Sequence, residues 1–135
     1  PDSVRLLPDG AVARAQVRAV AQAIACDIHP LNNLRVLNYL KAELGQGEDA
    51  RNGWYRHWVE TGFAALERQL AGSAGQCCFG DTPTLADVCL LPQVFNAQRF
   101  AVDMDAYPLL ARIAANLDVL PAFADAHPSR QPDAQ

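Results

Sequence analysis

The sequence predicts an all-α domain, a helical bundle of five to six helices. Apolar residues recur at steps of three and four through most of the chain, which is the period of a helix. No stretch alternates polar and apolar residues over the length of a strand, and glycine-containing segments separate the periodic ones. A chain of 135 residues, half of them hydrophobic, suits one domain with a real core.

The first predicted helix follows a short linker. Residues 1–8 have a proline at each end and no period, so we expect the remnant of an interdomain linker there. Asp9 can cap the helix, whose inward side chains would be Val17, Val20, Ala21, Ile24 and Ile28. The helical period resumes after Pro30 and ends at the "GQG" of residues 45–47.

A longer helix is predicted from about residue 48 to residue 70. Aromatic and apolar residues recur every four positions along it, with further apolar residues beside them: Trp54, Trp58, Gly62, Leu66 and Leu70, then Tyr55, Val59 and Phe63. Such a stripe is most simply a core face, and an aromatic platform for a ligand is the alternative.

A capping box marks the start of the next helix, after a loop over residues 71–83. In "TLAD", Thr84 would cap the N3 amide while Asp87 reaches back to the amide of Thr84. We assign both residues to folding. The helix should contain an internal proline, Pro92, and fade near residues 99–100. Its apolar residues are Val88, Leu91, Val94 and Phe95.

The last part of the chain predicts two shorter helices. Pro108 suits the first turn of one, with Leu109, Leu110, Ile113 and Leu117 facing inward. A short helix around Phe123 would complete the helical domain, which we place at residues 9–127. Residues 128–135 are expected to form an extended tail.

Charge and cysteine content exclude several classes of protein. A formal net charge of −4 argues against nucleic acid or an anionic membrane as partner, and no apolar run approaches the roughly 20 residues that span a bilayer. The cysteines form no disulfide framework and no Cys-x-x-Cys pair: Cys26, Cys77, Cys78 and Cys89. Reduced thiols in a cytoplasmic protein are therefore expected, with Cys26 buried. Cys26 and His29 could begin a metal site, but no second ligand pair follows, so we expect no metal.

The stretch "DIHPLNNLR", residues 27–35, places a proline inside a helical pattern, together with a histidine, two asparagines and an arginine. Pro30 has no N–H, so the helix must bend or start again near it. On a helical wheel, His29, Asn32, Asn33 and Arg35 share one arc and the neighbouring leucines take the other. A solvated face is the simpler interpretation. However, histidine and asparagine are poor helix formers that bind amides and carboxylates well.

A second stretch also has a proline inside a helical pattern, followed by an asparagine and an arginine. "PQVFNAQRF" places Asn96 and Arg99 after Pro92. Two kinked helices that each offer an asparagine and an arginine could line a cleft for an anion.

Three motifs resemble a known family. "DIHPLNNLR", "PQVFNAQRF" and "HPSRQPD", together with the "GDTPTLAD" capping segment, are similar to the C-terminal helical domain of zeta-class glutathione transferases, the maleylacetoacetate isomerases. The capping segment is shared across glutathione transferases, whereas the other three are more specific. The resemblance spans nearly the whole chain, about residues 3–133.

The resemblance implies an enzyme of which this chain is one part. Such enzymes begin with a thioredoxin-like domain whose Ser/Cys motif activates the thiol of glutathione, and the chain lacks that domain. Glutathione then serves as the covalent catalyst that isomerises maleylacetoacetate to fumarylacetoacetate in tyrosine and phenylalanine catabolism. A cytoplasmic homodimer acting on a small dicarboxylate is expected, and the isolated chain should be inactive.

The resemblance also assigns site residues. His29, Asn33, Leu34 and Arg35 match positions that contact glutathione or line the active site, with hydrogen bonding as the safer role for His29. Arg99 matches the arginine that holds a substrate carboxylate, with Arg35 as a second candidate, and a guanidinium suits such a bidentate contact. No catalytic residue is expected in this chain. The alternatives are a maleylpyruvate isomerase, a general glutathione transferase, and a non-catalytic interaction domain of the same fold.

Overall fold

A computed structural model describes residues 5–132, and they form helices and loops without a strand. The elements in chain order are α1 (Ala11–Gln22), the π-helix η1 (Ala23–Ile28), α2 (His29–Asn32), α3 (Leu34–Ala42), α4 (Glu48–Leu70), α5 (Leu85–Arg99), the 3-10 helix η2 (Met104–Ala106), α6 (Pro108–Asp118), α7 (Pro121–Asp125) and the 3-10 helix η3 (Pro128–Arg130). The predicted all-α class is confirmed.

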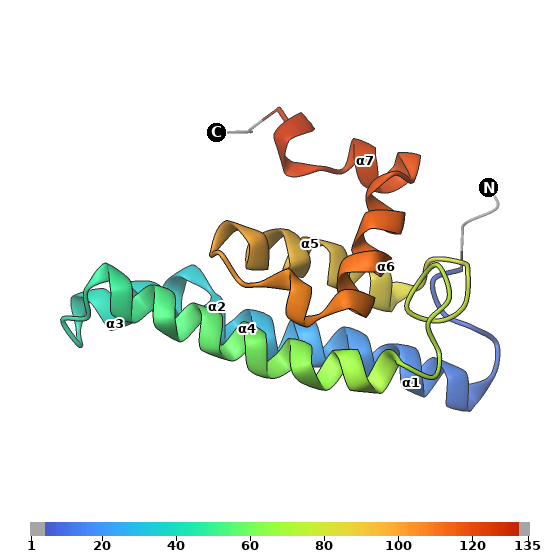
Figure 1. Cartoon of the computed structure of the whole chain (residues 1–135), viewed down its shortest axis with the longest axis horizontal. Coiled ribbons are helices and arrows are strands. Elements are labelled where there is room, and N and C mark those ends of the chain that lie inside the picture. The colour runs from blue at the N-terminus through green and yellow to red at the C-terminus, as the bar shows by residue number, and fades with distance from the viewer. Residues whose placement is uncertain (1–4, 133–135) are drawn as a thin grey trace.

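Two layers of helices build the domain (Figure 1). The first is a long helical hairpin, in which α1, η1, α2 and α3 run out and α4 runs back beside them. The second contains α5, which packs on α1 and η1, and α6, which packs on α4 and α5. The C-terminal elements α7 and η3 stand at the far end of α6, away from the hairpin.

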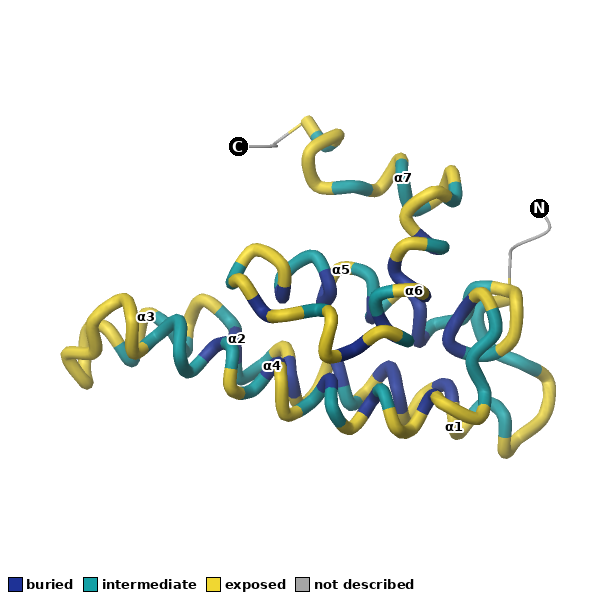
Figure 2. The backbone as a smooth tube through the Cα atoms, viewed as in Figure 1, coloured by how far each residue is buried: buried dark blue, intermediate teal, exposed yellow. Residues whose placement is uncertain are grey.

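The core lies where these helices meet, and it fades toward α3 (Figure 2). Its largest fully buried apolar side chains come from α1, α4, α5 and α6: Val17, Val20, Val59, Phe63, Leu66, Leu70, Leu90, Leu110, Ile113 and Leu117. The predicted inward face of α4 is confirmed, although both tryptophans keep part of their surface exposed. No residue of α3 is buried, so this helix projects from the body.

The N-cap residue of α1 differs from the prediction. Gly10, not Asp9, is the N-cap residue of α1, and no side chain caps this end. Asp9 instead pairs with Arg5 on the surface, at 2.9 Å. The preceding segment contacts the domain, because the Leu85 N–H donates to the Leu6 carbonyl at 2.9 Å and Leu7 packs against the core. The part of the predicted linker at residues 1–4 lies outside the described residues.

The first helix changes its geometry before Pro30. The π-helical turn η1 ends at Ile28, and the His29 N–H bonds the Ile24 carbonyl five residues back. A π-turn is rare and often accompanies an internal irregularity such as a proline. The chain leaves helical geometry only at Asn33, whose ψ is 148°, so the predicted interruption falls three residues after the proline.

The capping box at α5 is confirmed. The buried Asp87 carboxylate accepts from the Thr84 N–H at 2.7 Å and from the Thr84 hydroxyl at 2.9 Å. Its other oxygen accepts from the Cys78 N–H at 2.8 Å, which ties the preceding loop to the helix. The helix then continues through Pro92 to Arg99 without a break. Pro108 occupies the first turn of α6, as predicted.

Two other predictions are wrong. Cys26 is exposed rather than buried. It lies two residues from both Ile24 and Ile28, which are buried, so its side chain points away from the face that they share. The tail is not extended at η3, where His127 caps a 3-10 turn. Residues 133–135 of that tail lie outside the described part.

Candidate functional site

The corner between α2 and α3 carries four of the predicted site residues. At Asn33 the backbone is extended, and the Asn33 side-chain oxygen accepts from the Arg35 N–H at 3.1 Å. Asn33 is therefore the N-cap of α3, which leaves its amide N–H groups available to a ligand. The Arg35 N–H would be the helical partner of the Leu31 carbonyl, so the corner also frees that carbonyl.

The side chains at this corner face solvent. His29 and Arg35 are exposed, Asn33 is half-buried, and Leu34 is 69% exposed. The helical wheel placed Leu34 among the inward leucines. That placement is wrong, because the interruption at Asn33 rotates α3 relative to α2. The solvent-exposed Leu34 side chain next to the exposed Arg35 offers a ligand both an apolar surface and a cation.

The end of α5 carries the remaining candidate, Arg99. Its side chain is exposed, and its guanidinium carbon lies 5.9 Å from the centre of the Phe95 ring. Among residues 5–132, neither Arg99 nor Arg35 forms an ion pair. A cation without a carboxylate partner inside this region suits an anionic ligand.

Helix α4 brings the two groups of candidates to the same end of the molecule. The Trp54 indole N–H donates to the free Leu31 carbonyl at 2.8 Å. The next residue, Tyr55, stacks on Phe100 with ring centroids 3.6 Å apart and planes 5° from parallel. Arg56 donates to the Phe100 carbonyl at 3.5 Å. Consecutive residues of one helix thus hold both the α2–α3 corner and the end of α5.

The electrostatics of Tyr55 agree with this arrangement. Burial raises the pKa of the Tyr55 hydroxyl above its usual value, and the positive charge of Arg99 opposes the rise. The guanidinium therefore lies close enough to influence that hydroxyl.

Sequence reasoning missed three residues of this region. Asn32 was placed on the polar arc but is only 6% exposed, and its amide has no hydrogen-bond partner within the described chain. Trp54 and Tyr55 were interpreted most simply as core, with an aromatic platform for a ligand as the alternative, and neither was expected to support the site through contacts with other helices. The polar atom at the edge of each aromatic ring was the available signal, because a buried indole N–H or phenol usually finds a partner.

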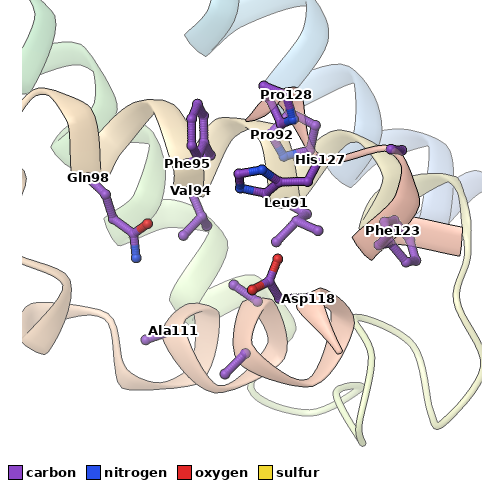
Figure 3. Close-up of a pocket in the computed structure, with 13 residues that line it drawn as sticks. Leu91, Pro92, Val94, Phe95, Gln98, Ala111, Asp118, Phe123, His127 and Pro128 are labelled. Carbon is purple, nitrogen blue, oxygen red and sulfur yellow. The ribbon is translucent and has the colours of Figure 1, made fainter. Parts of the chain in front are cut away.

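A cavity of about 390 Å³ lies elsewhere, between α5, α6 and the C-terminal elements (Figure 3). It contains none of the predicted site residues. Its walls are mainly apolar, and the His127 ring and the Asp118 carboxylate face into it. The His127 ring also contacts the Phe95 ring edge-on at 5.3 Å, and its Nδ1 lies 2.7 Å from the Ser129 hydroxyl.

Residues 5–132 contain neither a cluster of metal ligands nor a membrane-spanning helix. No group of three His, Cys, Asp or Glu side chains there could hold a metal ion. No helix in this range is long and apolar enough to cross a membrane.

Comparison with known proteins identifies the family. Residues 48–117 match the family model of the glutathione S-transferase C-terminal domain. The chain belongs to this family. The matched residues contain all of α4 and α5 and all but the last residue of α6, so this glutathione S-transferase C-terminal domain is defined by the helices that build the core and support the candidate site.

Named relatives of the domain are isomerases. A probable maleylacetoacetate isomerase of Vibrio cholerae is 55% identical over 130 residues, which is 96% of this chain. The holo structure of a bacterial zeta-class maleylpyruvate isomerase superposes with a TM-score of 0.93 at 47% identity, over 96% of this chain and 62% of that one. A maleylacetoacetate isomerase of Methylobacterium extorquens with bound malonate and glutathione gives a TM-score of 0.93 at 38% identity, over 98% and 63%.

The relatives are longer than this glutathione S-transferase domain. It spans 60% of the Vibrio cholerae protein, so about two fifths of that relative has no counterpart here.

Proposed function

We propose that this chain is the substrate-side domain of a glutathione-dependent cis–trans isomerase that converts maleylacetoacetate to fumarylacetoacetate. The pathway would be tyrosine and phenylalanine catabolism. The observation that carries the proposal is the pair of exposed arginines, Arg35 at the α2–α3 corner and Arg99 at the end of α5. We call these two regions the walls of the candidate site, and consecutive residues of α4 contact both of them. The names of the relatives support the same reaction class.

The donors at the α2–α3 corner fit glutathione. Glutathione supplies the thiol that adds to the cis double bond and later leaves. Its carboxylates and amides need hydrogen-bond donors, which the Arg35 guanidinium, the free Asn33 amide N–H groups and the His29 ring can offer. Leu34 would cover the apolar part of the bound molecule. This chain thus binds and orients glutathione and does not activate its thiol.

Arg99 would hold the substrate. A guanidinium binds a carboxylate through two parallel hydrogen bonds, which fixes both position and orientation. Negative charge that develops on the substrate oxygens during the reaction would also be stabilised by fixed cations nearby. Arg35 is the second candidate for this role, because it is also exposed and also forms no ion pair within residues 5–132.

We further propose that a thioredoxin-like domain completes the enzyme and activates glutathione. The relatives contain the additional length such a domain needs. One face of helix α5 carries an apolar row formed by Val88, Leu91, Pro92 and Phe95. None of these side chains is buried in the described chain. A second domain could cover that row and the adjoining cavity. A homodimer in the cytoplasm is proposed from the family resemblance.

Maleylpyruvate is the alternative substrate. A relative of known structure that is named maleylpyruvate isomerase is 47% identical to the chain, against 48% for the maleylacetoacetate isomerase of Pseudomonas aeruginosa. The two substrates share the cis double bond and the carboxylate that Arg99 would bind. They differ in length, so the space beyond Arg99 decides between them.

Assays of the protein that contains this chain test the proposal. We expect glutathione-dependent isomerisation of maleylacetoacetate, and a faster reaction with maleylpyruvate would favour the alternative. Arg99→Ala should lower kcat/KM for the dicarboxylate roughly ten- to a hundredfold and spare glutathione binding. Arg99→Lys should restore only part of the loss. Full kcat/KM together with a lower melting temperature would show that Arg99 only stabilises the end of α5.

A further inference from the structure

Three neighbouring residues of α4 contact both walls of the candidate site. Trp54 bonds the α2–α3 corner, while Tyr55 and Arg56 contact the end of α5 through Phe100. We propose that Trp54, Tyr55 and Arg56 are positioning residues, which hold the glutathione wall and the substrate wall at a fixed separation. This inference rests on the proposed function, because that function assigns a ligand to each wall.

The Trp54 contact joins α4 to the corner between α2 and α3. Helix α3 has no buried residue, and its first turn depends on the Asn33 cap. The interruption at Asn33 also leaves the Leu31 carbonyl without its usual helical partner, and the Trp54 N–H provides a replacement. Loss of this bond would let the corner that carries Asn33 and Arg35 move away from α4.

The Tyr55 and Arg56 contacts support a helix end that is strained. After Phe100 the chain turns through Ala101, whose φ of +56° is unfavourable for a residue with a Cβ. The Phe100 ring lies flat on the Tyr55 ring, and the Phe100 carbonyl accepts from Arg56. These contacts fix the residue directly after Arg99 and so restrict where its guanidinium can reach.

The platform itself is rigid. Helix α4 is 23 residues long, and beyond this triplet it is anchored by Val59, Phe63, Leu66 and Leu70, all of which are almost fully buried. Trp54 and Tyr55 are separated by about 1.5 Å along the helix axis and about 100° around it. The two walls are therefore set by different side chains of one support and can be disturbed one at a time.

Trp58 provides a matched control. It is the only other tryptophan, it lies one helical turn further along α4, and its ring meets the Trp54 ring edge-on at 5.6 Å. Its indole N–H has no hydrogen-bond partner among residues 5–132. Trp58→Phe therefore removes a similar volume as Trp54→Phe without removing a bond to the corner.

Amide hydrogen exchange of this chain tests the positioning directly. In Trp54→Phe, the amides of Val36 and Leu37, which bond the Asn33 carbonyl, should exchange about fivefold faster or more, the factor expected for one lost hydrogen bond. The Ala101 and Val102 amides should not change. In Trp58→Phe, the exchange rates of all four amides should stay within twofold of those in the unsubstituted chain.

The opposite pattern is expected for the other wall. Tyr55→Leu and Arg56→Gln should accelerate exchange at Ala101 and Val102 and spare the α3 amides. Tyr55→Phe, which keeps the stacked ring, should behave like the unsubstituted chain. Equal acceleration at both walls in every variant, or equal effects of Trp54→Phe and Trp58→Phe, would overturn the proposal. If Tyr55→Leu does not fold, Arg56→Gln and Tyr55→Phe still decide whether the contacts from α4 position the end of α5.

Steady-state kinetics of the protein that contains this chain test the functional half. Trp54→Phe should raise KM for glutathione severalfold with little change in KM for the maleyl substrate, and Arg56→Gln should do the reverse. A general loss of stability would move both constants together, which would contradict the assignment. If the unsubstituted protein does not isomerise either maleyl substrate, the proposed function fails, and hydrogen exchange still decides whether the triplet positions the two walls.

Discussion

Asp87 shows how one buried carboxylate organises a loop and a helix. It is fully buried and accepts hydrogen bonds from the Cys78 N–H, the Thr84 N–H and the Thr84 hydroxyl. Asp87→Ala would leave both N–H donors without this partner, the buried one of Cys78 and the part-buried one of Thr84. Thr84→Ala would remove only the hydroxyl and its cap.

We expect unequal effects of these two substitutions. Asp87→Ala should lower the free energy of unfolding by about 3 kcal/mol, because each unsatisfied buried donor costs about 1–3 kcal/mol. Thr84→Ala should cost about 1 kcal/mol, the scale of a lost cap. Urea denaturation of both variants measures the difference. Equal losses would mean that the bond to the Cys78 N–H contributes nothing.

The buried thiols predict how stability depends on pH. Burial raises the pKa of Cys78 well above its ordinary value, and the Asp87 charge adds to the effect. Burial likewise raises the pKa of Cys77, with Asp87 next in importance. The folded protein therefore keeps these protons at a pH where the unfolded chain loses them, above about 8.5. Stability should accordingly fall as pH rises beyond that value.

Melting temperatures between pH 7.5 and 9.5 check this expectation. The decline should be shallower in Cys78→Ala, which removes the most strongly perturbed thiol. Cys26→Ala is the control, because Cys26 is exposed, and its decline should match that of the unsubstituted chain. Parallel curves for all three proteins would contradict the proposed contribution of Cys78.

At the scale of the element, helix α5 ends in a turn that a glycine would suit better. The Ala101 and Val102 N–H groups bond the carbonyls of Gln98 and Ala97, which is the Schellman pattern, and Ala101 occupies its left-handed position. Ala101→Gly should raise the free energy of unfolding by about 0.5–1 kcal/mol, because the left-handed backbone costs alanine about that much more than glycine.

Gly80 supplies the converse variant for this experiment. Its φ is +69°, and a Cβ there would meet no atom within 4 Å, so Gly80→Ala isolates the backbone cost. It should lower the free energy of unfolding by about 1 kcal/mol. Thermal melts of both variants give the comparison. A destabilised Ala101→Gly would show that the entropy of glycine outweighs the relieved strain at this site.

Helix α4 approaches η1 closely at Gly62. A Cβ at Gly62 would overlap the Ile28 side chain at its Cγ1 and Cδ1 atoms. Since Gly62 also lies in the middle of a helix, replacing it with alanine would gain helix propensity if space allowed. We expect Gly62→Ala to lose about 1–3 kcal/mol instead, because overpacking exceeds that gain. Denaturant titration of the variant measures whether the free energy of unfolding falls or rises.

At the scale of the molecule, the sequence predicted the fold better than the site. The bounds of α4, the capping box and the first turn of α6 all follow from local signals, namely the spacing of apolar residues, Thr84 with Asp87, and Pro108. The error at Leu34 has a geometric cause. A helical wheel assumes a constant turn per residue, and the interruption at Asn33 does not obey it.

The site could be predicted only in part, because its geometry is tertiary. The polar residues on both walls were visible in the sequence. The contacts that hold the walls, from Trp54 to Leu31 and from Tyr55 to Phe100, join residues 23 and 45 positions apart in the chain. No local pattern specifies such pairs. The cavity beside His127 was missed for the same reason, since α5, α6 and the C-terminal elements all contribute to it.

For the isolated chain we expect no isomerase activity. The proposal assigns activation of the glutathione thiol to a separate domain, so this chain should bind ligands without turnover. Mixing the purified chain with glutathione and maleylacetoacetate, and following fumarylacetoacetate by absorbance, checks this. Turnover near that of a complete relative would mean that the thiol is activated by residues of this chain.

The contact between Gly62 and Ile28 has a consequence for how this domain can evolve. A larger residue at position 62 requires a smaller one at position 28, so the two positions should change together among related sequences rather than independently. The order of the changes would also matter. Shortening Ile28 first leaves a cavity that a later Gly62→Ala can fill, whereas the reverse order passes through an overpacked intermediate. The double variant should consequently be less destabilised than the sum of the two single variants.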